Sequence, residues 1–190
     1  MQKEESNLGD SSAVSLSSST DALEGLTITG HYDVECIGED GNVKWTDAIE
    51  NIIVAVGKID MFTKYFAGTA YSAAWYMGLV NNTPTPAYVV GDTLASHAGW
   101  AEFTSYSGAN RIAVAFVNAP TGTTTVTLTN STATSFSING SGTLAGCLLC
   151  QTQVRATTTG VLYSVGSFTG GTRAVVSGDT VNVTFSTTLT

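Results

Sequence analysis

His97 lies among side chains whose chemical types could support hydrolysis, since Asp92, Ser96 and Glu102 are close to it in the sequence. Ser96 is the direct neighbour of His97, however, and in ordinary backbone geometry it cannot present its hydroxyl to that imidazole. The sequence also has no Gly-x-Ser-x-Gly motif of the kind that presents a nucleophilic serine. We therefore expect His97 to hydrogen-bond within its own loop under Trp100, and we expect no catalytic residue and no enzyme activity.

The three cysteines do not form the even-numbered set that a disulfide framework needs. Cys147 and Cys150 have the CxxC spacing of a redox or zinc motif, but apolar residues surround both of them. Residues three apart on a strand point to opposite faces, and no second CxxC or His pair would complete a zinc site. Together with Cys36, they are predicted to be buried free thiols that bind no metal.

Other catalytic or cofactor sites find little support in the sequence. Asp179 is the only carboxylate residue after Glu102, and a glycosidase pair of Asp92 with Glu102 lacks a flanking aromatic groove. The acidic residues of segment 33–40 lack the spacing of a calcium loop, and no glycine-rich phosphate loop is present. The sequence predicts no cofactor.

Several aromatic residues could form a carbohydrate-binding platform, namely Trp75, Tyr76, Trp100, Tyr106 and Tyr163. Trp75 and Trp100 flank the same loop, so a sugar-binding protein would need an exposed cleft lined by both. Such residues also serve as core or interface anchors, and both interpretations remain open.

One helix is predicted among the elements that must position these residues. Apolar residues recur at steps of three and four, which is the stripe of a helix face: Ile49, Ile52, Ile53, Val56, Ile59, Phe62 and Phe66. Asp47 and Glu50 have the spacing of an N-terminal capping box, and Gly68 fits a C-terminal cap. The pattern predicts a substantial helix over about 47–66, in which another element packs closely against Gly57.

Strands are predicted for most of the remaining chain. In Leu26–Ile37 the apolar residues alternate with polar ones, and the turn 38–42 follows. Segment 74–80 is a short apolar strand, and segment 93–99 could form one helical turn. Further strands, joined by turns rich in Gly, Asn and Pro, are predicted at 111–117, 123–130, 134–138, 143–152, 161–168 and 180–189. This arrangement predicts a mainly β domain over residues 25–190, with a β-sandwich or jelly-roll-like core.

Residues 1–24 differ from the rest in composition. The segment is Ser-rich and acidic, and Leu8, Val14 and Leu16 are spaced along it. Such a composition cannot build a core, so we predict an extended N-terminal arm that is flexible or ordered by a partner. It also lacks the apolar stretch of a targeting signal, which predicts synthesis in the cytoplasm.

The charge of the chain excludes some partners. The formal net charge is −8 and the seven Lys and Arg residues are scattered, with no two adjacent. Nucleic-acid binding requires clustered Lys and Arg, so nucleic acid is not expected as a partner. Apolar runs are too short for a membrane span, so no membrane partner is expected either.

One stretch resembles a known group of proteins. The segment Asp92-Thr93-Leu94-Ala95-Ser96-His97-Ala98-Gly99-Trp100-Ala101-Glu102-Phe103 follows Trp75-Tyr76-Met77-Gly78-Leu79-Val80 after a Pro-containing loop. This pairing resembles a block that recurs in structural proteins of tailed-bacteriophage virions. With the ending Gly178-Asp179-Thr180-Val181-Asn182-Val183, the resemblance covers about a quarter of the chain. Within that group, the chain looks most like a capsid cement or decoration protein.

The resemblance implies a non-enzymatic role in the virion. Such proteins have β-sandwich or jelly-roll cores, assemble as trimers or dimers, and bind the major capsid protein on the capsid exterior. The expected interface residues are Leu8, Val14 and Leu16 of the arm, and Trp100 and Tyr106 of the loop. The alternative is a tail or fibre component that binds a carbohydrate or another receptor. The long Ser-rich arm departs from a minimal decoration domain and leaves an anchoring role open.

Overall fold

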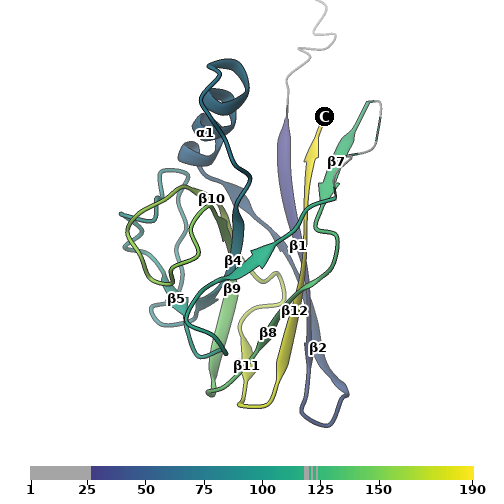
Figure 1. The fold of residues 1–190 in the computed structure, drawn as a ribbon. Helices are drawn as coiled ribbons and strands as arrows, with labels where there is room; N and C mark the ends of the chain where they lie inside the picture. The colour runs from purple at the N-terminus through teal and green to yellow at the C-terminus, as the bar shows by residue number, and fades with distance from the viewer. Residues whose placement is uncertain (1–26, 118–119, 121, 123) are drawn as a thin grey trace, which may run out of the picture.

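The structure is a computed structural model that describes residues 27–117, 120, 122 and 124–190 (Figure 1). In this part of the chain, twelve β-strands form two antiparallel sheets, and a single α-helix stands at one end. The prediction of a mainly β fold with one helix is therefore confirmed. The predicted arm, residues 1–24, lies outside the described residues.

The first sheet is built on two long paired strands. It consists of β1 (Ile28–Ile37), β2 (Val43–Glu50), β7 (Val126–Thr129), β8 (Thr134–Ser137) and β12 (Thr180–Leu189). The order is β2-β1-β12-β7, and β8 pairs with the other half of β12 on the same side as β7. β1 pairs with β12 over its whole length, from Ile28 opposite Leu189 to Ile37 opposite Thr180.

The second sheet has seven strands. They are β3 (Ile52–Ile53), β4 (Trp75–Asn81), β5 (Ala101–Phe103), β6 (Ile112–Val114), β9 (Gly142–Cys150), β10 (Leu162–Ser167) and β11 (Arg173–Val175). The order is β3-β10-β9-β4-β5, with β11 beside β9 and β6 beside β4. β3, β5 and β11, of two or three residues each, were not predicted, and neither was β2 of the first sheet, whereas β6 is shorter than the predicted strand 111–117.

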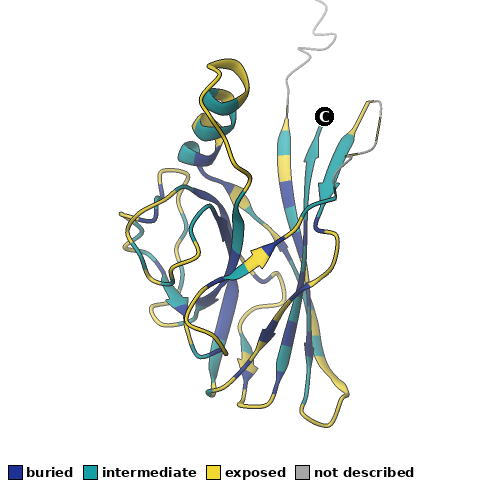
Figure 2. Cartoon of the chain, viewed as in Figure 1, coloured by how far each residue is buried: buried dark blue, intermediate teal, exposed yellow. Residues whose placement is uncertain are grey.

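The two sheets bury a common core, and the second sheet buries another core on its outer face. The inner core includes Tyr32 and Val34 of β1 and Val183 and Phe185 of β12, which confirms the predicted alternation of these strands. On the other face of the second sheet, the segment 82–100 covers a separate apolar cluster. β9 is consequently buried on both faces, which explains its uninterrupted apolar sequence (Figure 2).

The helix α1 spans Ala55–Phe66, so the predicted start near residue 47 is wrong. Asp47 belongs to β2, and the chain passes from the first sheet to the second through Asn51 before the helix begins. Ile49 and Ile53 are buried from two separate strands, and their spacing imitates that of a helix face. The C-terminal prediction is confirmed, because Gly68 follows the cap residue with a φ of 65°.

The close approach predicted at Gly57 is also confirmed. A Cβ atom at this position would lie 2.8 Å from the backbone oxygen of Tyr163 and 2.9 Å from its Cα. Only a glycine therefore allows α1 to lie this close to β10.

The helical turn predicted within 93–99 is not formed, because the chain there makes turns and bends. Among the described residues, no helix is long and apolar enough to cross a membrane.

Candidate functional site

The loop around His97 has a structural role. The imidazole stacks on the Trp100 ring with centroids 4.0 Å apart, and its Nδ1 donates to the Trp100 carbonyl at 3.1 Å. The Asp92 carboxylate accepts from the Trp100 indole at 2.9 Å and from the Val89 backbone N–H at 3.1 Å. The predicted role of His97 within its loop is thus confirmed.

Glu102 does not join that group, because it forms a buried ion pair with Arg111. Both oxygens of Glu102 accept from the guanidinium, at 3.0 and 2.9 Å, and the Ala156 backbone N–H donates to the same carboxylate at 2.8 Å. The Arg111 and Glu102 side chains are 2% and 4% exposed. The pair connects β5, which contains Glu102, with the loops that follow β5 and β9, and it contributes no nucleophile to the loop of His97.

Of the five predicted interface residues, the structure describes Trp100 and Tyr106. Trp100 and Tyr106 are buried, at 3% and 1% exposure, so neither side chain is available to another chain in this conformation. The Tyr106 ring packs edge-on against Phe136, and the Arg155 guanidinium lies over it at 4.6 Å. Leu8, Val14 and Leu16 lie outside the described residues.

The cleft required for carbohydrate binding by Trp75 and Trp100 is not present. Trp75 packs on the inner face of the second sheet against Phe116 and Tyr163, whereas Trp100 belongs to the cluster on the outer face. The sheet itself separates the two indoles. This requirement of the carbohydrate-binding interpretation is not met, because flanking the same loop does not place two residues on the same face of a sheet.

The side chains of Cys147 and Cys150 lie on opposite faces of the second sheet. As predicted from strand geometry, Cys147 faces the inner core and Cys150 faces the outer cluster. Burial raises the pKa of both thiols, and burial together with the negative charge of Asp179 raises the pKa of Cys36 to about 11. All three are protonated at neutral pH, whereas a nucleophile or metal ligand must be a thiolate. Within the described residues, no group of three or more His, Cys, Asp or Glu side chains is placed to hold a metal ion.

One end of the sandwich, which we call the hairpin end, contains the turn 38–42 and strand β11, and charged pairs close it. Asp47 accepts from Arg173 at 2.7 Å, from the Gly170 backbone N–H at 3.0 Å and from the Ala48 backbone N–H at 2.8 Å. Burial alone would raise the pKa of Asp47, but these hydrogen bonds and the Arg173 charge together hold it below its ordinary value. Near the turn, Lys44 donates to the buried Asp179 at 2.6 Å.

The opposite end, which we call the helix end, carries α1, the start of β1 and the C-terminus of β12 (Figure 1). Here the helix turns its apolar stripe to solvent: Ile59, Phe62 and Phe66 are 64%, 47% and 73% exposed. We call these three residues the outward face of α1. The side of the helix facing the sheets carries Gly57 and the polar Asp60, whose carboxylate accepts from Gln151 at 2.6 Å.

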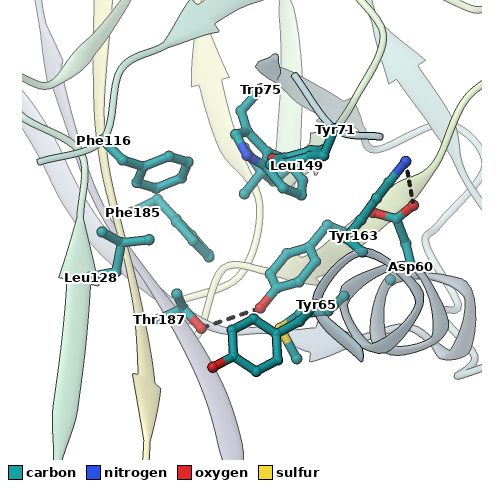
Figure 3. Close-up of a pocket in the computed structure, with 13 residues that line it drawn as sticks. Asp60, Tyr65, Tyr71, Trp75, Phe116, Leu128, Leu149, Tyr163, Phe185 and Thr187 are labelled. Carbon is teal, nitrogen blue, oxygen red and sulfur yellow. Dashed lines mark hydrogen bonds and ion pairs between the residues drawn. The ribbon is translucent and has the colours of Figure 1, made fainter. Parts of the chain in front are cut away.

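A second apolar feature of the helix end is a cavity of about 350 Å³ between α1 and the two sheets, which we call the mouth (Figure 3). Its walls come from α1, β4, β7, β9, β10 and β12 and from the segment after β6. The lining residues are Gly57, Asp60, Met61, Lys64, Tyr65, Tyr71, Trp75, Phe116, Leu128, Leu149, Tyr163, Phe185 and Thr187. Tyr65 lies at its rim and is 81% exposed.

The outward face of α1 was not predicted as an interface from the sequence, although the apolar composition of the helix indicates one. Besides Ile59, Phe62 and Phe66, the helix carries Met61 and Tyr65 on other sides. At 100° per residue, these apolar side chains occupy more than the stripe that a single packed face needs. A helix that is apolar on two sides has one side left for another contact.

Comparisons with known proteins do not assign the chain to a group. No family model matches it, and neither a curated protein nor a solved structure shows significant similarity to it.

Proposed function

We propose that the chain is a non-enzymatic structural protein of a tailed-bacteriophage virion, which binds the assembled capsid and stabilises it as a cement or decoration protein. The observation that carries the proposal is the outward face of α1. Three large apolar side chains project from a helix whose opposite side is already packed on the sheets. Contiguous exposed apolar surface of this kind marks sites of protein interaction. The sequence resemblance of segment 75–106 supplies the virion context.

The proposed mechanism is mass action. A protein that binds the assembled lattice and not its separated subunits stabilises the lattice by its own binding free energy, which is about 2.7 kcal/mol at a concentration one hundred times the Kd. The Phe62 and Phe66 rings are stacked with centroids 5.4 Å apart and present a paired aromatic surface. Repetition of this contact over a symmetric shell makes weak individual attachments sufficient.

The partners that fit this mechanism are the major capsid protein and further copies of the chain, as a dimer or trimer on the capsid exterior. Aromatic side chains that become fully desolvated are typical anchors of such interfaces. The net charge of −8 supports a protein partner rather than nucleic acid.

Cryo-electron microscopy of particles that contain the protein tests this proposal. We expect many symmetry-related copies on the outside of the shell, with density for α1 in contact with a neighbouring subunit. A location on the tail or on a fibre would support the alternative role in carbohydrate or receptor binding, and a glycan array would then identify the ligand. Absence of the protein from assembled particles would refute both roles.

A further inference from the structure

We propose that the mouth is the docking site for the N-terminal segment of the same chain, residues 1–26, and that apolar side chains of that segment fill it. This inference is independent of the proposed function. It concerns the cavity between α1 and the sheets, whereas the attachment proposed above uses the outward face of α1.

The first argument is the chemistry of the mouth. Its base and walls are formed by aromatic and aliphatic side chains, among them Trp75, Phe116, Leu128 and Phe185 (Figure 3). The polar groups of Thr187 and Asp60 in the lining already have partners. The Thr187 hydroxyl donates to the Thr29 carbonyl at 2.9 Å, and Asp60 is bound by Gln151 and lies 3.8 Å from Lys64. An apolar cavity with engaged polar groups accepts aliphatic side chains better than a polar ligand.

The second argument is where the segment begins. Thr27 and Thr190 exchange backbone hydrogen bonds of 2.7 and 3.0 Å, which fixes the start of the described chain beside the C-terminus of β12. Three residues further along, Gly30 pairs with Thr187, a residue that lines the mouth. The segment therefore joins the fold at the edge of the cavity. Its 26 residues, at about 3.3 Å each, reach about 86 Å when fully extended.

The third argument is the composition of the segment. Val14, Leu16 and Leu23 are spaced among serines, so they supply apolar side chains without forming a core of their own. The segment contains one Lys and five Asp or Glu residues, hence a net charge of −4, which is half of the total of −8. α1, at the edge of the mouth, carries Lys58 and Lys64 against one acidic residue, Asp60, hence a net charge of +1. The two charges are complementary.

The covalent link between residues 1–26 and the sandwich determines whether the segment in the mouth comes from the same chain or from a second copy. A segment that is covalently linked to the sandwich encounters the mouth of its own chain at an effective concentration on the order of millimolar. A segment from a second copy must compete with that value at the much lower concentration of the free protein. We therefore assign the contact to the same chain.

Paramagnetic relaxation in the full-length protein tests this assignment. A nitroxide is attached to Ser17→Cys, a position that leaves Val14, Leu16 and Leu23 in place. The label is selective because the native thiols of Cys36, Cys147 and Cys150 are fully buried. We expect the NMR signals of the Trp75 indole and the Leu128 methyl groups to lose most of their intensity. A label at Asn42→Cys, on the exposed turn of the hairpin end, should leave those signals unchanged.

Two matched double variants in the Ser17→Cys background separate a specific contact from random proximity. Leu16→Asp with Leu23→Asp should restore the mouth signals, whereas Ala13→Asp with Ala22→Asp adds the same charge and should leave them broadened. The proposal is overturned if the mouth signals are not broadened, or if both double variants behave alike. It is also overturned if broadening appears only when nitroxide-labelled and isotope-labelled chains are mixed, because the segment would then come from a second copy.

Discussion

The two ends of the sandwich differ in how far their apolar side chains are buried, although the same long strands run through both. At the hairpin end, Trp45 packs on Phe168 and its indole donates to the Ala174 carbonyl, while Asp47 and Arg173 close the gap between the sheets. The large apolar side chains left exposed there are two valines, Val43 and Val176.

At the helix end the sheets separate (Figure 2). Aromatic residues there lie in contact with solvent on α1 and around the mouth. Every polar group of Asp47 has a partner within the chain, whereas Phe62 and Phe66 have only each other and Tyr65 as ring partners. In the function proposed above, the hairpin end serves the stability of the fold, and the helix end serves contacts beyond the sandwich. Each prediction below tests one side of this comparison.

The largest loss of stability is expected for Asp47→Ala at the hairpin end. The substitution leaves the Arg173 guanidinium and the Gly170 backbone N–H without their acceptor. Arg173 is partly exposed and can be hydrated, so we expect a decrease of about 2–4 kcal/mol in the free energy of unfolding, measured with urea. Asp33→Ala, at an exposed carboxylate on the adjacent strand, should change it by less than about 0.5 kcal/mol. Equal effects of the two substitutions would refute a special role for Asp47.

A smaller loss is expected for Gly57→Ala, which tests how closely α1 packs on β10. The added methyl group would lie 2.8 Å from the Tyr163 carbonyl oxygen, and backbone atoms cannot move away as a flexible side chain can. Overpacking exceeds the gain in helix propensity, so we expect a net decrease of about 1–2 kcal/mol in the free energy of unfolding. Lys58→Ala, at the next and exposed position, serves as the control. A Gly57→Ala variant more stable than the native protein would show that α1 is free to move.

The pH dependence of stability should also reflect Asp47. Its pKa in the folded protein is held below the ordinary value of 3.8, so its contribution is fully present above that pH. The contribution is lost as the pH falls below 3.8 and through the folded-state pKa. In urea titrations from about pH 5 to about pH 2, the native protein should therefore lose its stability advantage over Asp47→Asn. A constant difference between the two proteins across this range would contradict the assigned cause.

Several features of the structure were predictable from the sequence. Tyr32, Val34 and Phe185 alternate with polar residues, and a period of two identifies a strand whatever it pairs with. The need for Gly57 was visible because a glycine inside a helix is unfavourable unless something approaches closely. Gly68 was recognisable for a similar reason, since its left-handed φ favours glycine.

Other features depend on tertiary contacts that no local pattern carries. Asp47 has the spacing of a helix cap to Glu50, but its actual partners are Arg173 and Gly170, more than a hundred residues away. The Glu102–Arg111 pair likewise depends on the pairing of both β5 and β6 with β4. Periodicity identified the apolar side of α1 but not whether that side faces the sheets or the solvent. An amphipathic pattern shows which side is apolar, and it does not show whether the fold or a partner covers that side.

The double variant Phe62→Asp with Phe66→Asp is expected to have little effect on stability and the largest effect on attachment. Because both rings are largely exposed, we expect the free energy of unfolding to change by less than about 1 kcal/mol. Val43→Asp is the matched control, since Val43 is 54% exposed at the hairpin end.

Retention of these two variants on assembled particles, measured as bound copies after sedimentation, tests most directly whether the helix end is the attachment surface. We predict that Phe62→Asp with Phe66→Asp is lost from the particles, while Val43→Asp is retained like the native protein. Retention of the double variant at native copy number, or an equal loss of both variants, would contradict the account.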